Sequence, residues 1–184
     1  MSKSRPVYAP FALDYAGARH LIVTELPEPP EALDTSLAEI TVFSLKTIAP
    51  GVPAPASAQH RSFRAKAELL AFLGPYLARE TMGLRLYAIG SEAFCWDIHN
   101  FGEAAGMGRS EIHLTHAGAR TRRVYCTHCK TRIEDAVLNI IPCPGCGASL
   151  FVRDHFSRQL GAFMGVKIDA EIPGEVFAAE GFET

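Results

Sequence analysis

The sequence predicts an α/β fold: a small, open, mostly parallel sheet with helices, followed by a four-cysteine zinc ribbon. Three observations support this. Apolar strand-like runs alternate with helical patterns through the first part of the chain, two Cys-x-x-Cys pairs follow, and 48% hydrophobic with 21% charged residues among 184 is typical of a chain that buries a core. We expect an α/β domain over 1–120, a ribbon over 121–166 and a C-terminal docking tail over 167–184.

The expected strands are short runs rich in apolar and β-branched residues. They are 20–25, 39–46, 84–89 and 111–116. Residues 1–18 are interpreted as an irregular arm, and the proline-bearing stretches 26–30 and 48–58 as connections, because proline gives no hydrogen to a strand ladder.

Two segments carry apolar residues at helical spacing. The first is 62–80, which Gly74-Pro75 is expected to kink or split. The second begins after Ser91 as N-cap and ends before Gly106. Its expected buried face consists of Phe94, Ile98, Phe101 and Ala105. Strands that alternate with helices in this order imply parallel pairing through crossovers.

Four cysteines form the Cys-x-x-Cys pairs Cys126/Cys129 and Cys143/Cys146, separated by thirteen residues. Both sulfurs of such a pair reach one ion from the same side, so the two pairs supply a tetrahedral site of the rubredoxin-like ribbon type. We expect one structural zinc, with iron as the alternative. Disulfides are disfavoured, because the start of the chain does not resemble a secretion signal and predicts a cytoplasmic protein with reduced thiols. A redox role is disfavoured because a redox-active Cys-x-x-Cys is usually single and opens a helix, whereas here there are two pairs and Gly147 follows the second. His128, inside the first pair, is not expected to be a ligand.

The formal net charge of −2 argues against a nucleic-acid or membrane partner. Basic residues nevertheless surround the ribbon. They are Arg120, Arg122, Arg123, Lys130 and Arg132. They either compensate a thiolate-rich centre or form a docking surface for an acidic partner.

Other polar residues suggest no self-contained active site, so whether the chain is itself an enzyme stays open. Cys95 is expected to be a small buried thiol. His113 and His116 are three residues apart on a strand and should not share a face. The polar residues of the second helix, Asp97, His99 and Glu103, are expected to be solvated.

Residues 87–91, the helix after them and 111–114 resemble the terminal strand–helix–strand of the nucleotide-binding half of ferredoxin-reductase-like flavoenzymes. In those enzymes the strand ends in a Cys-Gly-Pro-type turn near the nicotinamide, whereas here Ile89 and Ser91 replace the cysteine and the proline. The chain also lacks a glycine-rich turn for a pyrophosphate. We therefore expect a relic domain that does not bind NADPH measurably by itself.

Nearly the whole chain is similar to the DmmA-like small-subunit family of bacterial dimethylamine monooxygenase, on residues 124–129, 142–146 and, most specifically, 152–166. This resemblance implies a small non-catalytic or assembly subunit of an NADPH-dependent, multi-subunit monooxygenase. Such a complex demethylates dimethylamine to methylamine and formaldehyde. NADPH, flavin, iron–sulfur and haem are then expected only on the reductase and oxygenase partners. The alternatives are a rubredoxin-like iron electron carrier and a stand-alone zinc-ribbon binding module.

The run 155–165 combines apolar and cationic side chains, as interfaces do. We expect a partner interface there in a hetero-oligomer. Its residues would be Arg153, Phe156, Arg158 and Phe163. The alternative is that this run packs on the ribbon's own strands. The acidic tail, with Phe177 and Phe182, has the same two possibilities, a partner groove or its own ribbon.

Overall fold

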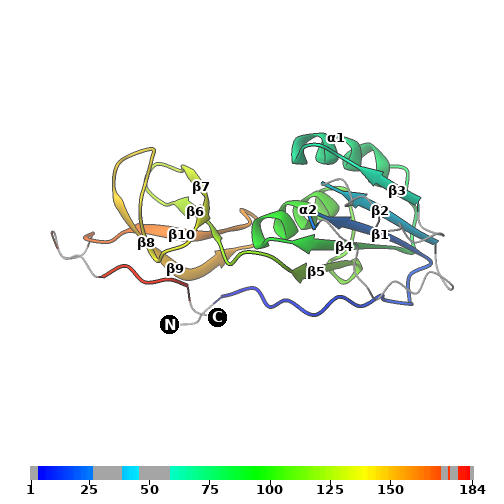
Figure 1. Ribbon diagram of the computed structural model, residues 1–184, viewed down its shortest axis with the longest axis horizontal. Helices are drawn as coiled ribbons and strands as arrows, with labels where there is room; N and C mark the ends of the chain where they lie inside the picture. Colours follow the sequence, from blue (N-terminus) through cyan, green and yellow to red (C-terminus); the bar gives the residue numbers. More distant parts are fainter. Residues whose placement is uncertain (1–3, 27–38, 46–58, 171–173, 175–177, 183–184) are drawn as a thin grey trace. The chain divides into compact units, whose positions relative to one another are not determined.

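The computed structural model describes residues 4–26, 39–45, 59–170, 174 and 178–182 (Figure 1). It divides into two compact units. One comprises Tyr8–Gly118, and the other joins Met1–Val7 to Ala119–Thr184. The start of the chain is thus grouped with the ribbon. The expected loop 48–58 and Phe177 lie outside the described residues.

The first unit contains a five-stranded parallel sheet in the order β3-β2-β1-β4-β5. Its strands are β1 (Arg19–Thr24), β2 (Glu39–Ser44), β3 (Gln59–Ser62), β4 (Leu84–Gly90) and β5 (Ile112–His116). The predicted open parallel sheet is confirmed. The chain moves outward from β1 to β3 and then returns to β4 on the other side of β1, so the order reverses between β1 and β4.

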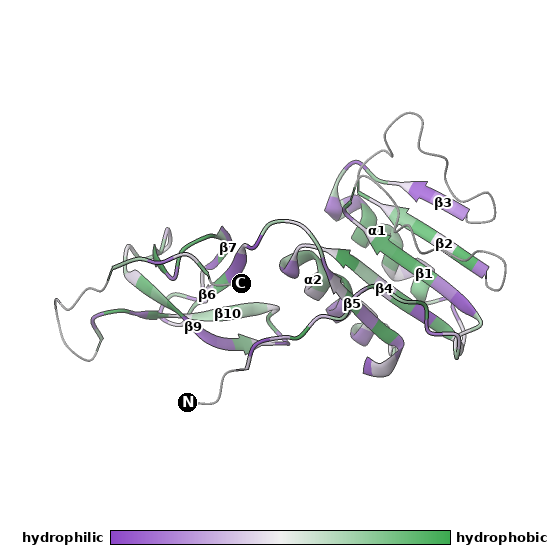
Figure 2. Ribbon diagram, turned by 60° about the horizontal axis from the view of Figure 1, so that its bottom comes forward, coloured by the Kyte–Doolittle hydropathy of each residue, from purple (hydrophilic) through white to green (hydrophobic). Residues whose placement is uncertain are grey.

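Strand β3 was not predicted, because its residues Gln-His-Arg-Ser lack the apolar, β-branched character of a buried strand. It occupies an edge of the sheet, where one side of its ladder has no partner among the described strands. Figure 2 shows the contrast between this hydrophilic edge and the hydrophobic strands β1, β2 and β4.

Helices α1 (Lys66–Leu77) and α2 (Glu92–Ala104) lie on the same face of this sheet (Figure 1). They bury a shared core, in which Leu69 and Leu73 of α1 and Phe94 and Ile98 of α2 pack with side chains of the sheet. Helix α1 is not split: it continues through Pro75 and ends two residues later, so the missing proline hydrogen bond affects its last turn.

Helix α2 begins as predicted, with the Ser91 hydroxyl accepting a hydrogen bond from Phe94 N. Gly106 follows its C-cap with φ +93°. The expected buried face was partly wrong, because Phe101 is 36% exposed whereas Gly102 is buried. A Cβ on Gly102 would lie 2.8 Å from Ile112 Cδ1, so this glycine lets the helix approach the sheet closely.

The opposite face of the sheet buries a second apolar cluster, centred on Ile22, Tyr87 and Ile89. The N-terminal arm covers part of it. Phe11 packs against this cluster, and its ring meets Tyr87 edge-to-face at 5.5 Å.

The second unit contains a five-stranded sheet in the order β7-β6-β10-β9-β8. Its strands are β6 (Arg122–Cys126), β7 (Arg132–Ala136), β8 (Ile140–Pro142), β9 (Ser149–Ser157) and β10 (Ala162–Lys167). Only the central β6–β10 pair is parallel among these described strands. Among the residues described, no helix has the length and apolar character that a membrane crossing requires.

Candidate metal centre

The structure brings together the four cysteines that the sequence proposed as ligands. Their Sγ atoms all lie within 4.8 Å of one another, with Cys126 and Cys146 at 3.9 Å and Cys129 and Cys143 at 3.5 Å. A metal–sulfur bond of about 2.3 Å gives sulfur–sulfur edges of roughly 3.8 Å in a tetrahedron. All four cysteines are free. The donor set therefore fits one four-coordinate thiolate site.

The two cysteine knuckles have the same backbone geometry. In each knuckle, the backbone N–H of the first cysteine donates a hydrogen bond to the carbonyl of the residue five positions later. The carbonyl of the same cysteine accepts one from the N–H of the residue four positions later. The bonds run from Cys126 N to Thr131 O, Lys130 N to Cys126 O, Cys143 N to Ala148 O and Gly147 N to Cys143 O. The fourth position after that cysteine has positive φ in both knuckles, +67° at Lys130 and +72° at Gly147. The two halves of the site are thus built by the same turn.

Thr131 and Gly145 hold the two knuckles against each other. The Thr131 hydroxyl lies 3.1 Å from Cys129 Sγ, and hydrogen bonds from its side chain and backbone lower the pKa of Cys129 to about 6. A Cβ on Gly145 would overlap Thr131 Oγ1 and lie 3.1 Å from Cys129 Sγ. Only a glycine leaves room for this contact.

Solvent reaches the site from one side. Cys126 and Cys143 are buried, whereas Cys146 is exposed. Among the described residues, the cluster consists of the four cysteines, and His128 is exposed on the first knuckle. Four sulfur donors suit zinc and iron alike.

Two of the basic residues near the site belong to the ribbon's own packing. Arg123 is 3% exposed and its Nε contacts both carboxylate oxygens of Glu134, at 2.9 and 2.8 Å. Arg122 Nη1 lies 3.1 Å from Asp154 Oδ1, and its guanidinium covers the Phe163 ring at 4.2 Å. Their charges are therefore used inside the ribbon.

The expected interface residues divide into two groups. Phe156 and Phe163 are paired across β9 and β10, their rings meet edge-to-face at 5.0 Å, and they are 7% and 2% exposed. Arg158 is exposed and Arg153 half-buried. For the two phenylalanines the structure shows the alternative, packing on the ribbon's own strands, because the strand register makes them a cross-strand pair.

The described part of the tail also folds onto the ribbon. Gly181 forms a bridge with Leu138, and Asn139 N donates to Glu180 O at 2.8 Å. The Phe182 ring lies 4.0 Å from the Arg122 guanidinium. This is the second of the two possibilities that the sequence left open.

A second candidate site is the point between β1 and β4 where the strand order reverses, because ligands of open α/β sheets bind there. The side chain of Glu25 occupies it. Its carboxylate accepts a hydrogen bond from Ser91 N at the start of α2, and a Cβ on Gly90 would lie 2.5 Å from Glu25 Cγ. The helix terminus that would face a phosphate thus faces a carboxylate of the same chain.

Sequence reasoning missed a cluster of aromatic and charged residues on the arm side of the sheet. Tyr87 stacks between His20 and His113, with ring centroids at 5.8 and 5.0 Å. Its hydroxyl lies 2.9 Å from His20 Nδ1 and accepts from Asp14 N at 2.8 Å. Tyr87 and His113 are register partners on β4 and β5, so they lie on one face of the sheet. That His20 of β1 and Asp14 of the arm join them is visible only in the structure.

Two further expectations concern α2. Cys95 is fully buried as expected, and burial raises the pKa of its thiol to about 12. His99 was expected to be solvated and is instead 6% exposed, with its ring tilted by 51° against that of Trp96 at a centroid distance of 4.7 Å. Asp97 contacts Lys66 at 2.8 Å.

Two models of one protein family match the chain. The N-terminal domain model of the dimethylamine monooxygenase subunit DmmA-like family matches residues 31–112, and the C-terminal domain model matches 123–166. The chain belongs to this family. The DmmA-like assignment confirms the resemblance found in the sequence. It is also supported by the heme-dependent oxidative N-demethylase delta subunit of Ectopseudomonas mendocina (strain ymp), which is 34% identical over 160 residues, 86% of this chain and 84% of that protein.

Solved structures give a more distant likeness. The siderophore-interacting protein SipS from Aeromonas hydrophila matches with a TM-score of 0.39 and 14% identity, over 57% of this chain and 52% of that one. Phthalate dioxygenase reductase matches with a TM-score of 0.37 and 11% identity, over 69% and 46%. This DmmA-like chain spans about half the length of each.

Proposed function

We propose that this chain is a non-catalytic assembly subunit of a multi-subunit oxidative N-demethylase. The observation that supports this most directly is the 34% identity with a delta subunit over 86% of the chain, which includes both the α/β sheet and the ribbon. The substrate of the complex is dimethylamine, converted with electrons from NADPH to methylamine and formaldehyde. Flavin, iron–sulfur and haem groups reside on the reductase and oxygenase partners.

The four-cysteine centre holds a structural zinc in this proposal. Four protein sulfurs complete a tetrahedral shell, so a zinc there supplies cross-linking of the two knuckles and no open position for a substrate. The ribbon depends on such a link, because few apolar side chains pack around the cysteines. Of these apolar side chains, that of Leu150 is buried.

The α/β unit serves as a scaffold. Glu25 places a negative charge where a pyrophosphate would bind, so the chain's own carboxylate competes with that ligand. This arrangement supports a role in holding partners, with the nucleotide chemistry on another subunit.

The proposal is tested by reconstituting the complex with and without this chain. The reductase and oxygenase subunits are co-expressed, their assembly is followed by size-exclusion chromatography, and formaldehyde release and NADPH consumption are measured with dimethylamine. We expect assembly and turnover only when this chain is present. Full assembly and full turnover without it would contradict the proposal.

The exposed position of Cys146 favours one alternative, an iron site that passes electrons through this sulfur. Elemental analysis and a visible spectrum of the purified chain distinguish the two. We expect one zinc and no visible absorption. Stoichiometric iron with thiolate charge-transfer bands would favour the electron carrier.

A further inference from the structure

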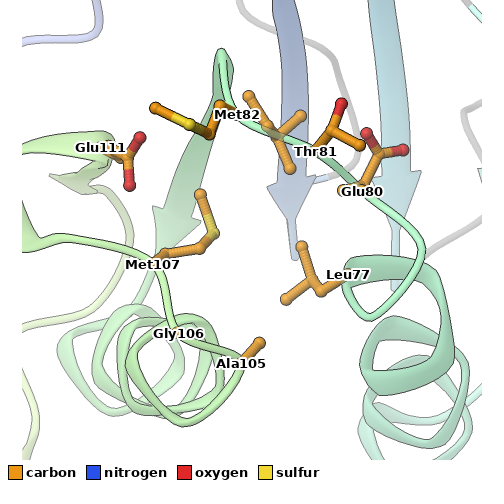
Figure 3. Close-up of a pocket in the computed structure, with 9 residues that line it drawn as sticks. Leu77, Glu80, Thr81, Met82, Ala105, Gly106, Met107 and Glu111 are labelled. Carbon is orange, nitrogen blue, oxygen red and sulfur yellow. The ribbon is translucent and has the colours of Figure 1, made fainter.

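A pocket of about 160 Å³ opens in the α/β unit where both helices end (Figure 3). It lies between the C-terminal ends of α1 and α2, the turn before β4 and the short segment after α2. Five of its lining residues carry the argument: Leu77, Glu80, Met82, Met107 and Glu111. It is separate from both the cysteine centre and the β1–β4 crevice.

The middle of the pocket is apolar and adaptable. Met82 and Met107 line it from the turn before β4 and from the segment after α2, and Leu77 lines it from the end of α1 (Figure 3). Met82 is 97% exposed in this chain, and burying its apolar side chain against a partner would be favourable. Methionines are frequent at recognition surfaces, since their unbranched side chains adjust to the group that packs on them.

The rim of the pocket is acidic, with Glu80 and Glu111 on opposite sides (Figure 3). Glu80 is paired with Arg19. Glu111 is compensated less, because Arg85 lies 2.5 Å from Asp14 but 3.7 Å from Glu111. The two carboxylates and Asp14 therefore outweigh the two arginines by one negative charge.

The helix ends add to this potential. The last turns of α1 and α2 carry partial negative charge from their carbonyl groups. Both helices lie wholly within the described residues, and neither has a basic residue in its last turn. A cation brought to the pocket would meet both ends at once.

We propose that this pocket receives a lysine or arginine side chain from a partner subunit of the demethylase, an inference that rests on the proposed function. The methylene stem of such a side chain packs on Met82 and Met107, and its cationic head lies between Glu80 and Glu111. A neutral apolar side chain would use the methionines but not the carboxylates. An acidic one would be repelled.

The test measures binding of the full chain to the co-expressed reductase and oxygenase subunits, immobilised through a tag on one of them. Met82→Lys puts a like charge in the pocket at an exposed position, so the fold is kept while the incoming cation is repelled. We expect binding at least about tenfold weaker. Met82→Gln removes no charge and should stay within about twofold. Ala71→Lys, on the exposed side of α1, is the control for added charge.

A second variant tests the carboxylate. Glu111→Gln keeps a side chain able to accept from Gly108 N, now at 2.8 Å, and removes the charge, so a loss of several-fold is expected. Wild-type binding by Met82→Lys, or an equal loss with Met82→Gln, would overturn the assignment of a basic side chain. A wild-type chain that binds none of the subunits would overturn the proposed function, and this inference with it.

Discussion

Two glycines of the second knuckle are needed for different reasons. Gly145 is needed for space, because a Cβ there would meet Thr131 and Cys129. Gly147 has no atom within 4 Å of such a Cβ, but its φ of +72° is unfavourable for other residues. The first knuckle accepts Lys130 at the equivalent position, where its Nζ donates to Thr127 O at 2.9 Å.

These two positions give a matched pair of variants. Gly145→Ala should displace Thr131 from Cys129 and speed metal loss to a chelator by at least about tenfold. Gly147→Ala should lower the free energy of unfolding by about 1 kcal/mol through backbone strain, and should leave metal release nearly unchanged. Release is followed with a chromogenic chelator and unfolding with urea. Equal release rates for the two variants would contradict this division of roles.

Three histidines, of which His20 is buried and His60 and His113 are half-buried, should make the chain less stable in mild acid. Burial lowers the pKa of His20, His60 and His113 below the usual 6.5. The unfolded chain then binds more protons than the folded one, so stability is present above pH 6.5 and decreases as the pH falls from there toward the folded pKa values. Urea midpoints at pH 8 and pH 5.5 check this. A midpoint that is unchanged or higher at pH 5.5 would contradict it.

At the scale of elements, the start of α2 determines whether the β1–β4 crevice accepts a nucleotide. Glu25→Ala removes the carboxylate and its hydrogen bond to Ser91 N, at an expected cost of about 1–2 kcal/mol. Glu25→Gln removes the charge and retains an acceptor. We expect no calorimetric signal from NADPH with the wild-type chain and weak binding with Glu25→Ala. Micromolar binding by the wild type would mean that Glu25 does not block the crevice.

Elements with strong patterns were predictable from the sequence, and weak ones were not. β1, β2 and β4 were found because buried strands are continuous apolar runs, and β5 was found from its apolar Ile112 and Leu114 at alternate positions. β3 was missed because its four residues, Gln-His-Arg-Ser, are all polar, unlike those of the other edge strand, β5. The buried face of α2 was predicted partly wrongly because it includes Gly102. This glycine packs closely on the sheet because it has no side chain, and a search for apolar side chains at helical spacing does not find it.

The candidate site was predictable where spacing defines it. Two Cys-x-x-Cys pairs specify their ligands locally, so the four sulfurs could be named without a fold. The interface residues could not be named in this way, because the sequence of a run such as 155–165 does not distinguish packing on a partner from packing on its own sheet. The pairing of Phe156 with Phe163 becomes visible only with the β9–β10 register.

At the scale of the whole molecule, the two units should differ in their dependence on metal. Trp96, the single tryptophan, is 4% exposed in α2 and reports on the α/β unit. A strong chelator, or Cys126→Ser, should make the ribbon sensitive to protease while Trp96 fluorescence stays unchanged. Loss of both signals together would show that the units unfold as one.

The grouping of the first residues with the ribbon has a consequence for synthesis. Ser4 N donates to Asp154 O, and Arg5 pairs with Asp154 across a sequence separation of 149 residues. At about 5–20 residues per second, the ribosome needs on the order of 10–30 s between these two ends. The α/β domain is thus inserted between two parts of the second unit, and residues 4 and 5 have no partner strand until the ribbon has been made. Changes at Ser4 and Arg5 should therefore disturb the ribbon, although about 150 residues separate them from it in the sequence.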